Sequence, residues 1–495
     1  MRLQTRETRV LMFGAMCLVL GCLLLVGPEF EVAWADSVNT GRVVDLSRYR
    51  AQLFLHDGRV VDHQSGVDVV IGRIEKHPKP VLVPDQPWEL GTVGYTCVLH
   101  GREEGLYKMW YESRENMGKP NAGEKGRCLY AVSKNGLDWE KPALGLIRSE
   151  GSDQNNIVFM APPGAEKTKV YWVIKDYAEP DPARLYKMMF HLWDYDGRGV
   201  GIAHSPDGIR WAATRHVKLH GGFDSQNLFF WDDRVGQYVG YLRTFTYGKR
   251  SIGRSLSPDA FHWSEPVTVH ATDENDPPAH DLYTPTIFKY SQADDVYVMF
   301  TAVFDRESNT VFGQLAVSRD GIGWHRFREP FVPLGGAGAW DAGSIYPVAA
   351  EVVIGGKNAI YYRGNDYGHG AGGSPGFGVV FLHEGGFVGR RAKGRGTLTT
   401  HPLRVADARR GLTLNADAAG GSIHAELLTT DGDVIPGFSR DDFQVITGKG
   451  ADLPLEWEGK EVRSALMKGD VRLRLYLDKA TVYGFRSVNS RRAPG

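Results

Sequence analysis

Cysteine is scarce in this 495-residue chain, which excludes a small fold held together by disulfides. Four cysteines are present, and two of them lie within the first 22 residues. The other two, Cys97 and Cys128, can pair in an oxidising compartment or remain buried thiols, and the sequence leaves both readings open. The chain has no Cys-x-x-Cys pair and no cluster of His and Cys, so we expect no zinc site.

The sequence also lacks an excess of charge and lacks helical periodicity. Its 58 basic and 59 acidic residues leave a net charge of -1, which gives no reason to expect a nucleic-acid partner. Apolar residues almost never recur at helical spacing between residues 45 and 390. The chain instead contains 60 glycines, 12 tryptophans and 21 tyrosines, a composition typical of turns and aromatic-rich strands.

Only one long apolar run is present, and it lies at the N-terminus. Three arginines precede the run from Val10 to Val26, and Ala33-Trp34-Ala35 follows it. This order predicts a signal peptide at 1–35, and hence a secreted or periplasmic protein that has no membrane contact after cleavage. Two alternatives remain: a single membrane anchor, and a lipoprotein box ending at Cys22.

A seven-residue phrase occurs four times. The copies are SKNGLDW from Ser133, SPDGIRW from Ser205, SPDAFHW from Ser257 and SRDGIGW from Ser318. Asx-Gly provides a tight turn, and the serine can bond to the turn's backbone. We therefore interpret the phrase as a strand-connecting hairpin and assign no catalysis to its aspartates.

Aromatic strand patterns precede each phrase and define a repeating unit. The predicted second strands begin at Leu106, Leu185, Gln237 and Val296, and a fifth unit without the phrase has its second strand at Ala359. The predicted first strands are 93–99, 156–160, 227–231, 284–290 and 344–348. Four short strands in each of five units predict an all-β fold, a five-bladed β-propeller over 45–390. Alternating strands over 395–490 predict a C-terminal β-sandwich.

An acidic residue stands ahead of the first strand in every unit. Because first strands line a propeller's channel, we expect these acids to converge, together with Glu112 from a second strand. Clustered carboxylates suit glycoside hydrolysis, in which one protonates the leaving oxygen and another activates water or attacks the sugar. The candidate catalytic residues are Glu89, Glu112, Asp153, Asp224, Asp281 and Asp341.

Further residues near the same strand ends are candidates for substrate binding. Aromatic rings can stack on sugar faces, and arginines can hold carboxylates of the protein or of a ligand. The candidates are Trp88, Arg114, Asp176, Gln226, Arg243, Tyr283, Trp340, Tyr346, Arg363, Asp366 and His369.

These phrases, aromatic runs such as YKMWYES at 107–113, and the appended sandwich resemble the five-bladed propeller superfamily of arabinanases, invertases and levansucrases, glycosidase families 32 and 43. The resemblance implies three acids from the first three blades, at places near Glu89, Asp153 or Asp176, and Asp224. The invertase-type Asn-Asp-Pro, Arg-Asp-Pro and Glu-Cys runs are absent, which implies a divergent member. Some relatives hold calcium in the channel, but no ligand loop here indicates it, so we expect neither metal nor cofactor.

The sequence thus favours a secreted glycoside hydrolase acting on a poly- or oligosaccharide. One alternative is a propeller that binds carbohydrate without catalysis. The other is a sialidase-like enzyme, because the repeated phrase resembles an Asp box and Arg114, Arg243 and Arg363 can form a carboxylate-binding triad.

Overall fold

The computed structural model describes residues 42–46, 51–114, 126–160, 164–165, 167–194, 197–217, 225–348, 351–370, 372–405 and 410–489. The predicted signal peptide and the candidate Asp224 lie outside these ranges. None of the described helices is long and apolar enough to cross a membrane.

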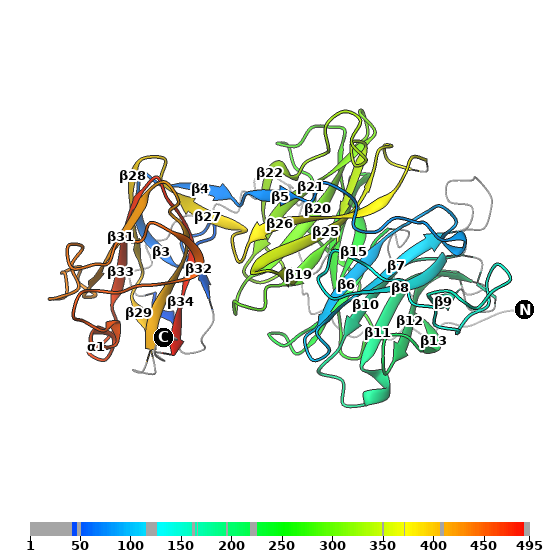
Figure 1. The fold of residues 1–495 in the computed structure, drawn as a ribbon, viewed down its shortest axis with the longest axis horizontal. Helices are drawn as coiled ribbons and strands as arrows, with labels where there is room; N and C mark the ends of the chain where they lie inside the picture. The colour runs from blue at the N-terminus through cyan, green and yellow to red at the C-terminus, as the bar shows by residue number, and fades with distance from the viewer. Residues whose placement is uncertain are drawn as a thin grey trace, which may run out of the picture. The chain divides into compact units, whose positions relative to one another are not determined.

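The described chain is almost entirely antiparallel β-structure, as the sequence predicted, and its central part is a propeller of five blades (Figure 1). Each of the first four blades is a meander in which neighbouring strands pair along the chain. The first blade has β6 (Thr96–Gly101), β7 (Leu106–Arg114), β8 (Gly126–Ser133) and β9 (Ile157–Met160). The second has β10 (Lys167–Lys175), β11 (Tyr186–Asp194), β12 (Gly197–Ser205) and β13 (Ala212–Val217). The third has β14 (Leu228–Asp232), β15 (Gln237–Thr246), β16 (Lys249–Ser257) and β17 (Val267–His270).

The last two blades each have an inner strand in two pieces. The fourth has β18 (His280–Thr284) and β19 (Ile287–Lys289), then β20 (Tyr297–Asp305), β21 (Thr310–Ser318) and β22 (His325–Val332). The fifth has β23 (Ser344–Pro347) and β24 (Val352–Ile354), then β25 (Lys357–Asn365), β26 (Gly376–His383) and β5 (Ile74–Lys76). Short 3-10 turns, η1 (Pro87–Glu89) and η2 (Pro182–Arg184), lie in the connections.

The fifth blade is completed by a strand from near the N-terminus. Strand β5 pairs with β26, with Lys76 opposite Val380, so segments about 300 residues apart share one sheet. The inner strand β10 contacts both β6 and β14, and β24 contacts β6, which closes the ring between the last and first blades. The sequence supplied no fourth strand for the fifth unit, and β5 is that strand.

The second blade corrects one of the predicted strand positions. Residues 156–160 were expected to form its first strand, but β9 pairs with β8 as the outer strand of the first blade. The inner strand of the second blade is β10, which pairs with β11.

The repeated phrase forms turns as predicted, and these turns also join blades. Ser205 Oγ accepts a hydrogen bond from the Gly208 N–H at 2.9 Å, and Asp207 accepts two more from the following backbone. The indole of Trp110, in the first blade, donates to the Gly208 carbonyl in the second at 2.6 Å. Equivalent bonds run from Tyr241 to the Gly321 carbonyl and from Tyr361 to the Gly136 carbonyl. Each of these turns therefore docks onto an aromatic residue of a neighbouring blade.

Gly208→Ala should destabilise the protein by about 2–4 kcal/mol, because a Cβ adds both backbone strain and a clash. Gly208 has a φ of +77°, and a Cβ there would lie 2.7 Å from the Trp110 ring. Gly236→Ala is the matched control, since its φ is +65° but no atom lies within 4 Å of a Cβ. Urea unfolding would measure both, and equal losses would contradict the docking role of the turn.

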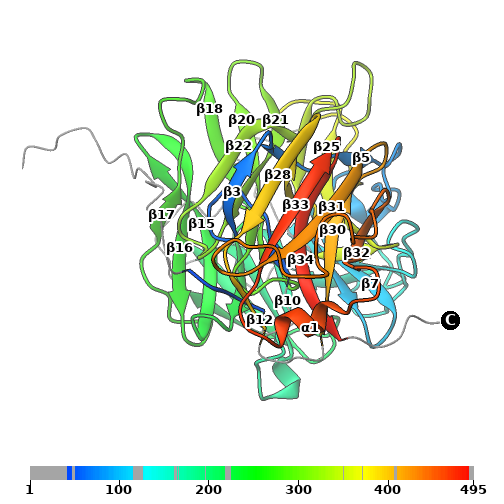
Figure 2. The same cartoon turned by 90° about the vertical axis from the view of Figure 1, so that its left-hand side faces the viewer.

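The sandwich consists of two sheets packed over a common apolar core (Figure 2). In one sheet, β3 (Val61–Ser65), β28 (Arg395–Thr400), β33 (Arg472–Asp478) and β31 (Ser422–Leu428) run side by side. The other contains β32 (Lys449–Pro454), β30 (Arg410–Asp417), β34 (Thr481–Asn489), β27 (Val388–Arg391), β4 (Asp68–Ile71) and β2 (Gln52–Leu53). The pair β1 (Val44–Asp45) and β29 (Leu403–Arg404) and the helix α1 (Val462–Leu466) complete it.

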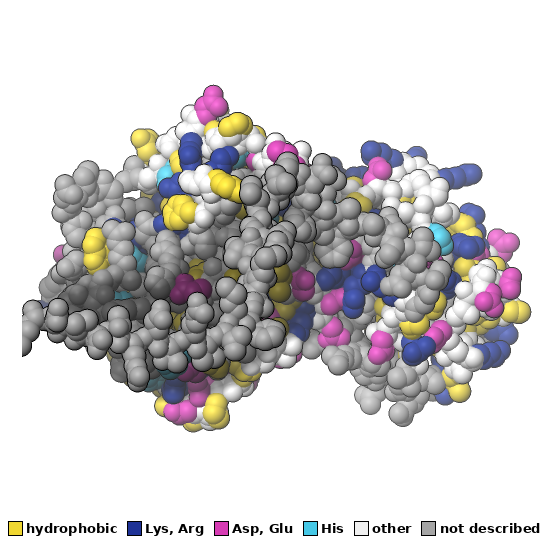
Figure 3. Space-filling view, turned by 180° about the vertical axis from the view of Figure 1, so that it is seen from behind, with side chains coloured by type: hydrophobic (Ala, Val, Ile, Leu, Met, Phe, Trp, Pro, Cys, Tyr) yellow, Lys and Arg dark blue, Asp and Glu magenta, His cyan; other side chains and the backbone are white. Residues whose placement is uncertain are grey.

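The sandwich thus draws four strands, β1 to β4, from residues 44–71. The sequence predicted a sandwich made only of residues 395–490 and a propeller starting at 45. The pairing shows that the chain first contributes to the sandwich and only then to the fifth blade. On the face seen in Figure 3, described side chains of both signs are interspersed, in keeping with the net charge.

Candidate functional site

Side chains from four blades meet at one end of the inner strands. The rings of Tyr95, Tyr283 and Tyr346 come from the first, fourth and fifth blades. The centre of the Tyr346 ring lies 6.1 Å from that of Tyr95 and 6.0 Å from that of Tyr283. Arg243, from the third blade, lies 5.9 Å from the Tyr283 ring. We call the central cluster the set Tyr95, Glu112, Arg114, Arg243, Arg250, Asp281, Tyr283, Phe304, Tyr346, Arg363 and His369.

Local pairing positions these residues. Tyr346 on β23 lies opposite Arg363 on β25, and Asp281 on β18 lies opposite Phe304 on β20. In the first blade the Glu112 N–H donates to the Tyr95 carbonyl at 3.0 Å. Since paired residues project to the same face of a sheet, the first, fourth and fifth blades each present an inner-strand and a second-strand side chain together.

His369 lies against the aromatic part of the cluster. Its Nδ1 is 2.7 Å from the Tyr346 hydroxyl, and its ring is 4.7 Å from Tyr283 and 4.4 Å from Phe304. Burial, followed by the positive charges of Arg250, Arg363 and Arg243, lowers the His369 pKa to about 4. The imidazole is therefore neutral near pH 7. Burial also raises the pKa of Tyr95 and Tyr346 well above the usual value, so these phenols keep their protons.

Glu112 is the carboxylate that lies beside the tyrosines of the central cluster. It is fully buried, its Oε1 is 2.8 Å from Arg114 Nε, and its Oε2 accepts from the Tyr95 N–H at 3.2 Å. A Cβ on Gly94 would lie 2.3 Å from Oε2, so glycine is needed there for the carboxylate to fit. An ion-paired carboxylate can act as a base or nucleophile, and Arg114 fixes its orientation.

Asp281 is also at the centre, but it is fixed by two arginines. Arg250 Nη1 bonds to its Oδ2 at 2.6 Å, and Arg306 contacts both of its oxygens. Burial alone would raise the pKa of Asp281, but the hydrogen bonds from Arg306 and Arg250 outweigh it and hold this pKa below its usual value. Asp281 therefore positions Arg250, whose guanidinium lies 5.0 Å from the Tyr283 ring.

Gln226 lies beside Arg243 in the third blade. Its chain neighbour Asn227 accepts a hydrogen bond from the Arg243 N–H at 3.1 Å, which brings this segment next to Arg243. Gln226 is 1% exposed, and neither atom of its amide has a hydrogen-bond partner in the described structure. A buried amide left in this state is a candidate for bonding to a ligand.

Three other predicted acids are buried in ion pairs outside the cluster. Glu89 is 2.7 Å from Lys141 Nζ and accepts from Tyr111, and Asp341 is 2.7 Å from Lys76 Nζ and accepts from Tyr362. Asp176 lies 2.6 Å from Lys187 Nζ. These pairs fix strands and connections, so the expectation that all five acids ahead of first strands would share one hollow does not hold.

Asp153 is exposed, because it precedes the outer strand β9 rather than an inner strand. Asp366 is exposed too and accepts from the Ser374 N–H. Neither contacts the central cluster through any interaction that the structure describes.

The two predicted tryptophans lie away from the cluster. Trp88 donates to Asn156 at 2.7 Å. Trp340 stacks on Tyr362, with centroids 5.6 Å apart, and borders a hollow of about 360 Å³ that Pro80, Gly91 and Ser374 also line. Trp340 therefore keeps a position where a sugar ring can stack.

Tyr95, Arg250 and Phe304 belong to the cluster but were not singled out from the sequence. A signal for Tyr95 existed, because Tyr95, Tyr283 and Tyr346 each lie at or near the start of a predicted first strand. Arg250 is the second residue of β16, the third strand of its blade, whereas the candidates from the sequence came from the first and second strands.

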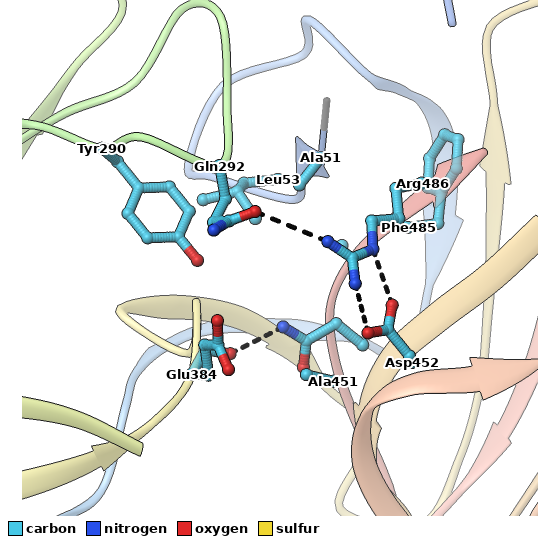
Figure 4. A pocket seen from close by; sticks show the side chains of 11 residues that line it. Ala51, Leu53, Tyr290, Gln292, Glu384, Ala451, Asp452, Phe485 and Arg486 are labelled. Atoms are coloured by element: carbon cyan, nitrogen blue, oxygen red, sulfur yellow. Dashed lines mark hydrogen bonds and ion pairs between the residues drawn. The ribbon is translucent and has the colours of Figure 1, made fainter. Parts of the chain in front are cut away.

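A second cavity, of about 190 Å³, lies where residues 290–292 and 384 approach the sandwich residues 51–53, 451–452 and 484–486 (Figure 4). Arg486 forms a two-pronged ion pair with Asp452, and the carboxylate of Glu384 and the hydroxyl of Tyr290 border the same space. Burial raises the pKa of Glu384.

Glu384→Gln should raise Tm by about 1–3 °C at pH 7 and leave it unchanged at pH 4. A carboxyl whose folded pKa is raised binds its proton more tightly when folded, so stability falls as pH rises past the unfolded value of 4.5. The amide cannot ionise and so avoids that loss. Calorimetry at the two pH values tests this, and a lower Tm for the variant at pH 7 would contradict it.

Within the described ranges, Cys97 and Cys128 are both free and buried, and no group of three or more His, Cys, Asp or Glu is placed to hold a metal ion. The Val173 N–H lies 3.3 Å from Cys97 Sγ, and burial raises the pKa of both thiols. The sequence left open whether these cysteines form a disulfide or remain buried thiols, and in the structure they are buried thiols.

No protein-family model matches the sequence, and no curated protein matches it. Among solved structures, a glycosyl hydrolase from Bacteroides ovatus is similar at 15% identity, with 63% of this chain and 94% of that chain covered and a TM-score of 0.41. An N-acetylgalactosamine deacetylase from F. plautii, in complex with blood group B trisaccharide, is 15% identical over 69% of this chain and 95% of that one, with a TM-score of 0.41. The α-L-arabinofuranosidase PaAbf62A from Podospora anserina, in complex with cellotriose, is 12% identical over 63% and 97%, with a TM-score of 0.43. These neighbours thus include a glycosyl hydrolase and an α-L-arabinofuranosidase.

Proposed function

We propose that this protein is a glycoside hydrolase whose reaction takes place at the central cluster. The observation that carries the proposal is the buried Glu112–Arg114 pair beside three tyrosines, at a point where strands from four blades converge. A carboxylate held in a desolvated, aromatic setting is suited to attack at, or deliver water to, a sugar carbon.

In this proposal Glu112 acts as the base or nucleophile, and Arg114 holds it. The tyrosine rings provide stacking surfaces for a sugar. Burial raises the pKa of Tyr95 and Tyr346, so these two phenols keep their protons and donate hydrogen bonds to it. Asp224 lies outside the described residues, and its place two positions before Gln226 makes it our candidate for the proton donor. Export through the N-terminal segment remains part of the proposal, with a poly- or oligosaccharide outside the cytoplasm as substrate.

One observation favours a second candidate, a carbohydrate-binding protein without catalysis. Asp281, Glu89 and Asp341 are all neutralised by arginine or lysine, which leaves few carboxylates for chemistry. Such a protein would bind glycans through the same tyrosines without cleaving them.

The test is incubation of the purified protein with a broad panel of plant, algal and microbial glycans. We expect release of reducing sugar from at least one, and loss of that release in Asp224→Asn. Binding without turnover of any bound glycan would support the second candidate and overturn the hydrolase.

A further inference from the structure

Arg363 differs in its partners from Arg114 and Arg250, two other arginines of the central cluster. Arg114 is paired with Glu112, and Arg250 is paired with Asp281. Arg363 is 6% exposed, and the one hydrogen bond that the described structure gives it runs from Nε to the Val93 carbonyl at 2.8 Å. Its two terminal nitrogens therefore have no carboxylate partner within the described chain.

A buried guanidinium without an anion is costly, because the charge has lost most of its water. The structure fixes Arg363 in place all the same. The Val93 bond anchors Nε, and the guanidinium carbon lies 5.2 Å from the centre of the Tyr346 ring. The Val93 carbonyl and the Tyr346 ring thus fix the orientation of the guanidinium, which leaves its terminal nitrogens available to a ligand.

The surroundings of Arg363 suit an anion. Burial is the largest effect on Arg363 and lowers its pKa. Tyr346, Arg114, Tyr95 and the Glu112 carboxylate are also close enough to influence its charge, although none of these acids forms an ion pair with it in the described structure. Protonated phenols at Tyr95 and Tyr346 and the neutral His369 add hydrogen-bonding groups without adding negative charge.

We propose that Arg363 binds the carboxylate of an acidic sugar, so that the substrate of the central cluster is a glycan containing uronic acid. The planar fork of a guanidinium matches the two oxygens of a carboxylate, and such a bond is stronger than one between neutral groups. An arriving carboxylate also removes the cost of the unpaired buried charge. This inference rests on the proposed function only in taking the ligand to be a carbohydrate.

The experiment is titration calorimetry of the full chain with oligogalacturonides and glucuronate-containing oligosaccharides, each beside its carboxyl-reduced, neutral counterpart. For the wild type we expect the acidic form of at least one pair to bind about 10–100-fold more tightly than the neutral form. Arg363→Gln should bring this ratio close to one, and Arg363→Lys should retain part of it. The wild-type ratio needs no variant, so the test stands even if a variant fails to fold.

Arg390→Gln is the matched control. Arg390 is also buried and also bonded to backbone carbonyls, those of Leu55 and Asp57, but it lies on β27 of the sandwich. It should keep the wild-type ratio. Equal binding of acidic and neutral forms, binding of no acidic glycan, or an unchanged ratio in Arg363→Gln would each overturn the inference. Cleavage of a neutral glycan with no acidic preference would leave the hydrolase standing, whereas acid-dependent binding without cleavage would remove the hydrolase and keep this site.

Discussion

Glu112→Gln is expected to lower kcat by about 10²–10⁴-fold while the fold is retained. The amide keeps the size of the side chain and one oxygen for Arg114, but it can neither take up a proton nor attack a sugar carbon. Turnover of the best substrate from the glycan panel, measured beside the Tm of each variant, gives the result.

Glu89→Gln is the matched control for this change. Glu89 is also a fully buried glutamate of the first blade, also ion-paired, but to Lys141 and outside the central cluster. We expect this variant to lose stability and keep kcat at temperatures where it is folded. Equal loss of kcat in the two variants would mean that either change acts through the fold, and the role given to Glu112 would be abandoned.

Asp341→Ala should destabilise the protein by about 3–5 kcal/mol, because it leaves the positive charge of Lys76 without its buried carboxylate partner. The activity of the folded fraction should stay intact. Lys76 belongs to β5, the strand that completes the fifth blade, so this pair ties the N-terminal segment to the ring. Denaturant unfolding of Asp341→Ala measures the loss.

The double variant Asp341→Ala with Lys76→Met gives the control, since it removes both charges. We expect it to be more stable than Asp341→Ala alone. A stable Asp341→Ala protein with no activity would instead assign Asp341 to catalysis, as the sequence pattern suggested.

The repeated turns could be predicted because their chemistry is local. Ser205, Asp207 and Gly208 lie within four residues and form their hydrogen bonds with each other, so the phrase itself specifies the turn. The number of blades followed from counting aromatic strands between those turns. The docking of Trp110 on the next blade could not be predicted, since its partner is 98 residues away.

The candidate site was harder to predict because the fate of a carboxylate depends on distant cations. Nothing near Asp341 in the sequence reveals Lys76, which is 265 residues away, and the same holds for Glu89 and Lys141, 52 residues apart. For Asp153 the error lay in the strand assignment that placed it ahead of an inner strand. The long connection between β8 and β9 made the outer strand of one blade look like the first strand of the next. Arginines and tyrosines of the second and first strands predicted the cluster better than the acids did.

The most direct test of this account is a crystal structure of the protein with an acidic oligosaccharide soaked into it. The account predicts a sugar ring between the tyrosines of the central cluster, with its carboxylate on Arg363 and a ring carbon facing Glu112. A sugar bound only in the hollow beside Trp340, or only in the cavity of Figure 4, would contradict it.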